Sequence, residues 1–200
     1  MNKKIGMYSS LINVCAVIGF ALCMLLGTNF GSYLVCMFIA FSFVPMMSAF
    51  CVYSKPERKV AGNTAMIFAG MYAVFILLVY YSQVTTVQID TLTEQAAALL
   101  DFQNFGLMFS YDMLGYCLMA VSTFFAGLTI EVKTTSDKWL KWLLLVHGVF
   151  AISCFILPMA GLFTPNMEGA EWIGTAVLTF WCIYFIPVGI LSFLHFKNKQ

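Results

Sequence analysis

Six apolar stretches, each long enough to cross a membrane as a helix, fill most of this 200-residue chain. A helix needs about 20 apolar residues to span roughly 30 Å of hydrocarbon. Hydrophobic residues make up 62% of the chain and charged residues only 10%, against roughly a quarter charged in a soluble domain. The sequence therefore predicts an all-α membrane bundle, a single transmembrane domain over residues 1–200. The expected spans cover about residues 8–27, 33–53, 64–84, 106–130, 139–163 and 172–194.

All the basic residues fall on one side of this predicted bundle. They lie in the two terminal segments and at the second and fourth loops: Lys3, Lys4, Lys55, Arg58, Lys59, Lys133, Lys138, Lys141, Lys197 and Lys199. The opposite loops hold only acidic charges: Asp90, Glu94, Asp101, Glu168 and Glu171. Because short loops rich in Lys and Arg stay cytoplasmic, we expect a plasma-membrane protein, of the bacterial inner-membrane kind, with both termini in the cytoplasm. The first stretch is too long for a signal peptide, so it should be retained as a helix.

The longest loop, residues 85–105, carries a helical pattern of its own. Thr91 and Glu94 have the S/T-x-x-E spacing of a capping box. Apolar residues then recur at helical spacing: Leu92, Ala96, Leu99 and Phe102. This pattern predicts a short amphipathic helix along the outer interface, between the third and fourth spans. It could serve as a packed connector or as a lid over an outer cavity.

Small residues recur every fourth position on two of the predicted helices. They are Ala61, Ala65, Ala69 and Ala73 on the third helix, and Cys15, Gly19, Cys23 and Gly27 on the first. Such ridges let helix backbones approach closely, so we expect them to pack against neighbouring helices. All seven Cys residues lie inside predicted spans without a CxxC pair. Cys23 and Cys36 share a depth, which leaves a disulfide between them as an alternative to free thiols.

Asp112 is the one carboxylate well inside a predicted span. It lies about six residues from the start of the fourth span, or roughly 9 Å below the outer boundary. An ionised carboxylate in lipid is costly, so Asp112 should face the bundle interior or a water-filled cavity. No Lys or Arg lies at that depth. A ligand, an ion or a proton would have to supply the counter-charge, unless Asp112 is neutral or hydrogen-bonded to hydroxyls.

Other polar and aromatic residues near the depth of Asp112 complete a candidate ligand site. They are Tyr80, Tyr81, Gln83, Tyr111, Trp172, Thr175 and Thr179, together with Tyr116 one turn below Asp112. The residues fit an outward-facing pocket; alternatively, Asp112 only ties helices together through a hydroxyl. His147, about 12 Å from the inner side, is a candidate proton relay or a neutral histidine bonded to a hydroxyl or carbonyl. His195 lies at the inner boundary and is expected to be interfacial.

Several kinds of function are disfavoured by what the sequence lacks. Two distant histidines without an acidic pair at ligand spacing do not make a metal site. No HExxH, GxSxG or Walker-type loop occurs. No dense basic patch with interleaved aromatics suggests nucleic acid as a partner. We therefore expect no metal, no cofactor and no enzymatic activity.

One segment of the fourth span carries a resemblance to a known group of proteins. Asp112-Met113-Leu114-Gly115-Tyr116 and Ser122-Thr123-Phe124-Phe125-Ala126-Gly127-Leu128 resemble a segment of small six-span bacterial membrane proteins of unknown function. The size and span count are also similar to the S components of energy-coupling-factor vitamin transporters. Those proteins usually carry an Ala-x-x-x-Ala surface in helix one, whereas the alanine ridge here lies in helix three.

Three function hypotheses follow from the sequence. The first is a membrane protein that binds a small apolar or cationic ligand around Asp112, for transport or sensing. The second is a membrane subunit or scaffold, such as a transporter S component, that acts through a protein partner or as a homo-oligomer. The third, which is the least favoured, is an intramembrane enzyme using His147 or Asp112.

Overall fold

The computed structural model describes residues 1–89, 91–163 and 170–199, and within these ranges the chain is helical, without strands. Six segments are long and apolar enough to span a membrane. They are formed by α1 (Asn2–Leu25), α2 (Asn29–Tyr53), α3 (Lys59–Val84), α5 (Leu107–Thr129), α6 (Thr135–His147) continued by α7 (Phe150–Met159), and α8 (Ala170–Lys197). The prediction of an all-α chain with six helices of membrane-spanning length is confirmed.

Several helices extend beyond the apolar stretches from which they were predicted. α1 begins at Asn2 rather than near residue 8, and α2 at Asn29 rather than near residue 33. α3 begins at Lys59 rather than near residue 64, and α8 continues to Lys197 rather than ending near residue 194. An apolar stretch marks only the part of a helix that fits the hydrocarbon, whereas the helix can continue into the polar interface. Hydropathy therefore underestimates these helix lengths.

The fifth span is two helices rather than the single helix expected over residues 139–163. α6 ends at His147, and α7 runs only from Phe150 to Met159. At the break, the amides of Gly148 and Ala151 bond to carbonyls three residues earlier, a 3₁₀ pattern. A Cβ on Gly148 would lie only 2.9 Å from the Phe124 Cβ of α5. The close approach to α5 thus requires glycine where the helix changes course.

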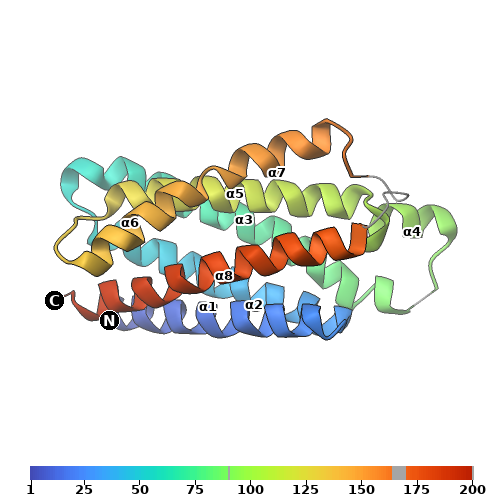
Figure 1. The fold of residues 1–200 in the computed structure, drawn as a ribbon, viewed down its shortest axis with the longest axis horizontal. Coiled ribbons are helices and arrows are strands. Elements are labelled where there is room, and N and C mark those ends of the chain that lie inside the picture. Colours follow the sequence, from blue (N-terminus) through green and yellow to red (C-terminus); the bar gives the residue numbers. More distant parts are fainter. Residues whose placement is uncertain (90, 164–169, 200) are drawn as a thin grey trace.

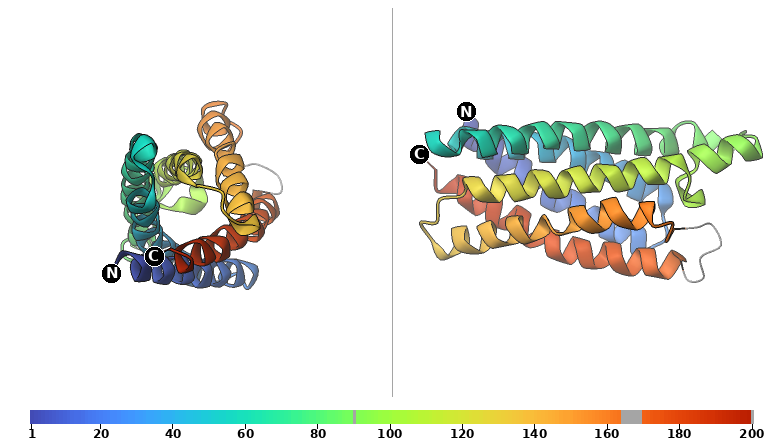
Figure 2. Two further views of the ribbon diagram at one scale, coloured as in Figure 1. Left: turned by 90° about the vertical axis from the view of Figure 1, so that its left-hand side faces the viewer. Right: turned by 90° about the horizontal axis from the view of Figure 1, so that it is seen from above.

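The helices run side by side along one long axis (Figures 1 and 2). α1 packs against α2 and α8, α3 against α2 and α5, and α6 against α5 and α8. Both termini lie at one end of the bundle together with loops 54–58 and 130–134 (Figure 1). We call this end, which holds the lysines and the single arginine, the basic end. The opposite end, with the connector between α3 and α5, is the acidic end.

Small residues allow α3 and α5 to approach closely. Ala65 and Ala69 of α3 are fully buried. The Ser122 hydroxyl of α5 donates to the Ala65 carbonyl at 2.7 Å, so the predicted packing role of the alanine ridge is confirmed. On α1, by contrast, Cys15 is exposed. Cys23 does not pair with Cys36, because all seven cysteines are free thiols.

Basic side chains at the basic end donate hydrogen bonds to backbone carbonyls near the C-termini of helices, where no intrahelical partner is available. Lys59 donates to the Cys51 carbonyl near the end of α2 at 2.8 Å. Arg58 donates to the Ile130 carbonyl beyond α5 at 2.9 Å. Lys55 lies 2.9 Å from Glu131, and its hydrogen bond lowers the pKa of the Glu131 carboxyl. Some of these cations therefore satisfy the unpaired carbonyls of helix C-termini.

The connector between α3 and α5 contains η2 (Val87–Ile89), α4 (Glu94–Leu100) and η3 (Phe102–Asn104). A short helix thus lies where one was predicted, but its cap differs. Thr93, not Thr91, is the N-cap, and its hydroxyl accepts from the Ala96 amide at 3.3 Å. Gly106 packs directly against the Ala98 carbonyl, where a Cβ would clash. This contact folds α4 back onto the start of α5.

Candidate ligand site at Asp112

The carboxylate of Asp112 is buried in the acidic half of the bundle. Asp112 lies in the second turn of α5 and is 4% exposed. Its Oδ1 atom has no hydrogen-bond partner within the described part of the chain. The basic residues lie at the basic end, so none of them can neutralise this charge. A buried ionised carboxylate is strongly unfavourable on its own, so this group calls for a proton or another cation.

Phenol and thiol groups from three helices surround the carboxylate. The Tyr80 hydroxyl of α3 lies against Asp112 but leaves Oδ1 unpartnered. Tyr116 of α5 and Cys36 of α2 lie beside Tyr80. From α8, Trp181 packs edge-on against Tyr116, with ring centroids 5.6 Å apart. The site is therefore an acidic group in an aromatic enclosure, and in the described part of the chain its polar neighbours are weak hydrogen-bond donors.

Four aromatic rings cover the helix ends around this site on the acidic side. We call this cluster, formed by Phe102, Tyr33, Tyr80 and Phe109, the aromatic cap. The ring of Phe102 lies 6.0 Å from those of Tyr33 and Tyr80 and 5.4 Å from that of Phe109. Beside it, Gln103 donates to the Tyr33 hydroxyl at 2.8 Å. The connector is thus packed onto α2, α3 and α5.

Gln83 fixes this cap to the end of α3. Its Oε1 accepts from the Phe102 amide at 3.0 Å, and its Nε2 donates to the Leu100 carbonyl at 2.9 Å. Both ends of the amide are therefore occupied by the backbone of the connector. Although the sequence suggested Gln83 as a ligand-binding residue, these bonds make it a clamp for the cap.

Replacing Gln83 with leucine should loosen the connector while the bundle stays folded. Two backbone groups would lose their partners, at about 1–3 kcal/mol for each unsatisfied group. Hydrogen exchange of residues 94–105 should therefore accelerate by at least tenfold. Gln103→Leu is the matched control, because its bond to Tyr33 is exposed and should matter less. Equal acceleration in both variants would contradict the clamp.

Three of the predicted ligand residues lie away from Asp112. Tyr81 is 63% exposed and Trp172 is 69% exposed. Tyr111 packs against Phe75, with ring centroids 5.7 Å apart. Tyr80 and Tyr81 are neighbours in sequence, yet successive helical residues point about 100° apart, so only one of them can face the interior. Depth in the membrane was predictable, but the face of each helix was not.

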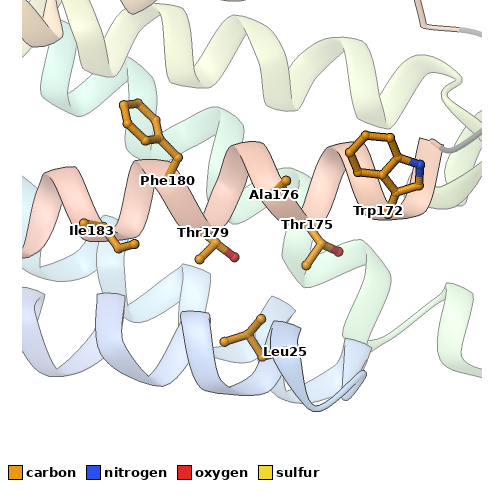
Figure 3. Close-up of a pocket in the computed structure, with 7 residues that line it drawn as sticks. All are labelled: Leu25, Trp172, Thr175, Ala176, Thr179, Phe180 and Ile183. Carbon is orange, nitrogen blue, oxygen red and sulfur yellow. The ribbon is translucent and has the colours of Figure 1, made fainter.

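Thr175 and Thr179 belong to a separate groove on α8. Figure 3 shows both on the side of α8 that faces α1, where Leu25 lies. The groove has a volume of about 640 Å³ and is open to the surroundings. The Thr179 hydroxyl oxygen is buried without a hydrogen-bond partner among the described residues.

Two residues of the enclosure, Cys36 and Trp181, were not predicted. Cys36 carried no signal other than its depth. Trp181 did carry one, because tryptophan usually lies at the membrane interface, where its N–H is solvated. A tryptophan near the middle of a span therefore indicates a buried acceptor nearby.

That acceptor is His147, at the break between α6 and α7. Trp181 Nε1 donates to His147 Nε2 at 3.1 Å, and His147 Nδ1 lies 2.8 Å from the Thr123 hydroxyl. That hydroxyl donates to the Ala120 carbonyl at 2.9 Å, so it must accept the Nδ1 proton. Both ring nitrogens are satisfied in the neutral form. The geometry favours a histidine that joins α5, α6 and α8 over the alternative of a proton relay.

A second buried histidine, His195, pairs with Asp137 at the basic end, and we call this pair the clasp. His195 Nδ1 lies 2.6 Å from Asp137 Oδ1, and the side chains are 5% and 9% exposed. Asp137 Oδ2 accepts from the backbone amides of Lys133 and Thr134 at 3.1 and 3.0 Å. His195 is therefore not the interfacial residue that was expected. The Thr134-x-x-Asp137 spacing of a capping box was the sequence signal for Asp137, but nothing local identified its partner.

No protein-family model, curated protein or solved structure matches the chain. Among the residues that the structure describes, no cluster of three or more His, Cys, Asp or Glu could hold a metal ion.

Proposed function

We propose that this protein is a multi-pass plasma-membrane protein that binds a small cation at Asp112, for transport or for sensing. The observation that carries this proposal is the buried Oδ1 atom of Asp112, which has no hydrogen-bond partner among the described residues. A bound cation would supply the charge that no side chain provides at this depth.

The surroundings of Asp112 favour a cation over a purely apolar ligand. An apolar molecule would leave Oδ1 without a partner, at a cost of about 1–3 kcal/mol or more for a charged group. The aromatic side chains of Tyr80 and Tyr116 lie near Asp112, and aromatic rings attract ammonium-type cations. A proton or a small ammonium ion satisfies both features of the enclosure.

The distribution of charge gives the proposed direction of access. If the basic end faces the cytoplasm, in keeping with the positive-inside rule, both termini are cytoplasmic and the acidic end faces outward. Acidic side chains of the connector, such as Glu94 and Asp101, would attract cations to that side. The cap around Phe102 would then have to shift before a ligand could enter or leave from that side.

Asp112→Asn tests the proposal, because asparagine keeps the shape and removes the charge. Thermal unfolding of the purified chain would be followed with sodium, methylammonium and tetramethylammonium chlorides at constant ionic strength and at several pH values. We expect at least one cation, or a proton, to stabilise the native chain by about 2.7 kcal/mol at a hundred times its Kd. Asp112→Asn should fold with a similar melting temperature and lose that response.

A pair of adjacent tyrosines provides the control for this experiment. Tyr80→Phe removes the hydroxyl beside Asp112 and should weaken the cation response. Tyr81→Phe changes an exposed ring and should leave the response intact. A native chain that responds to no cation or proton, with a lower melting temperature in Asp112→Asn, would instead identify Asp112 as a structural link between helices.

One observation favours a second candidate function, that of a membrane subunit acting through contacts. α7 packs mainly on α5, with a further contact between Phe150 and Tyr184 of α8, and none of its residues is buried. A second copy of the chain, packed on α7, would bury that helix. Native mass spectrometry from lipid nanodiscs should then show a dimer that Ile152→Lys, a change at an exposed position of α7, converts to monomer. A monomeric native chain would remove this candidate.

A further inference from the structure

A groove between α1 and α2 opens to the surroundings in the basic half of the bundle. Its volume is about 480 Å³. The lining side chains include Lys4, Tyr8 and Ile12 of α1 and Phe38, Phe41 and Pro45 of α2. Most of these side chains are apolar, and four of them, Tyr8, Ile12, Phe38 and Phe41, are more than half exposed. The groove is therefore an apolar surface that a neighbouring molecule in the membrane can cover.

The charge at this groove is positive and confined to its basic end. Lys4 is one of the lining side chains, and no carboxylate of the described residues lines the groove. Lys4 forms no ion pair with any described residue, whereas Lys55 is paired with Glu131 and Lys59 binds carbonyls of α2. Lys4 is thus free to bind an anion at the point where the apolar lining begins.

The order of charged and apolar side chains along the groove matches the order of headgroup and acyl chain in one lipid leaflet. Lys4 and Ile12 are eight residues apart, or about 12 Å along a helix at 1.5 Å per residue. They share a face of α1 with Tyr8, at spacings of four residues. A cation at the interface followed by about 12 Å of apolar surface matches a phosphate headgroup followed by the upper part of an acyl chain.

We propose that this groove binds one anionic phospholipid of the leaflet at the basic end. The lipid phosphate pairs with Lys4, and one acyl chain lies along Tyr8, Ile12, Phe38 and Phe41. A zwitterionic lipid would carry its own cation beside the phosphate and gain less from Lys4. This site is separate from Asp112 and does not depend on the function proposed for it.

Native mass spectrometry of the delipidated full chain tests the proposal. Phosphatidylglycerol and phosphatidylcholine with identical acyl chains serve as probes at equal concentrations. The native chain should retain the first phosphatidylglycerol more strongly than phosphatidylcholine. Lys4→Gln should reduce retention of phosphatidylglycerol about fivefold, the effect of one lysine beside an anionic lipid surface, and leave phosphatidylcholine unchanged.

Two further variants separate the groove from general surface charge. Lys138→Gln removes an exposed, unpaired lysine from the same end of the described bundle and should leave lipid retention unchanged. Ile12→Trp fills the groove at an exposed position and should reduce phosphatidylglycerol retention as strongly as Lys4→Gln. Equal losses in Lys4→Gln and Lys138→Gln, or native retention in Ile12→Trp, would overturn the proposal.

Discussion

Replacing Asp137 with alanine is expected to lower the free energy of unfolding by about 2–5 kcal/mol. The change removes a buried hydrogen bond to a carboxylate, worth about 1.5–3 kcal/mol, and a helix cap, worth about 0.5–2 kcal/mol. His195 would keep a buried ring without its partner, in contact with Phe50 and Phe196, whose ring centroids lie 5.8 and 5.6 Å away. The start of α6 would also lose the carboxylate that accepts from the amides of Lys133 and Thr134, just before the helix. SDS-induced unfolding in mixed micelles measures the change.

A double-mutant cycle distinguishes this pair from two independent contributions. Asp137→Ala combined with His195→Ala should lower the free energy of unfolding by less than the sum of the two single losses. Once either partner is removed, the hydrogen bond between them is already lost, so removing the other partner cannot break it again. Glu131→Ala is the control, since its pair with Lys55 is largely exposed and should matter little. Additive costs for Asp137 and His195 would show that the clasp is not a coupled unit.

Replacing His147 with alanine is expected to lower the free energy of unfolding by about 2–4 kcal/mol. The change opens a cavity among Phe150, Tyr184 and Phe185, whose rings lie 5.1–5.8 Å from the imidazole. It also leaves the Trp181 N–H without its acceptor. The same unfolding measurement should detect a large loss, and α7 should exchange its amide hydrogens faster because the change lies at its junction with α6.

His147→Phe separates the packing role of this residue from a role in proton transfer. Phenylalanine restores most of the side-chain volume but none of the hydrogen bonds. His147→Phe should therefore lower the free energy of unfolding less than His147→Ala does. If His147 is structural, the cation response assigned to Asp112 should survive in His147→Phe. Loss of that response in a stable His147→Phe chain would instead support a relay between His147 and Asp112.

Residues predicted at a similar depth in the membrane do not all face the interior of the bundle. Asp112, Tyr80 and Tyr116 were predicted at similar levels, and they do lie together. Tyr81 and Trp172 have a suitable depth but are exposed. Position along an apolar stretch fixes depth at about 1.5 Å per residue, whereas the face depends on how each helix rotates against its neighbours.

The two histidines show the same limit for pairs distant in sequence. His147 and Trp181 are 34 residues apart, and Asp137 and His195 are 58 residues apart. Each residue could be placed on a helix, yet no local pattern indicated which helices would be neighbours. The break after His147 was also missed, because the packing of Gly148 against Phe124 arises only when α5 and α6 meet.

The sequence by itself determined the number of apolar helices, the separation of basic and acidic ends and the isolation of Asp112 from any fixed cation. These properties follow from hydropathy and charge, which act residue by residue along the chain. Only the tertiary structure decided that Oδ1 of Asp112 lacks a partner within the described ranges, that Gln83 clamps the connector and that His147 and His195 are buried and hydrogen-bonded to other side chains. Those properties depend on contacts between helices, and in lipid such contacts are selected by close packing and hydrogen bonding rather than by hydrophobicity.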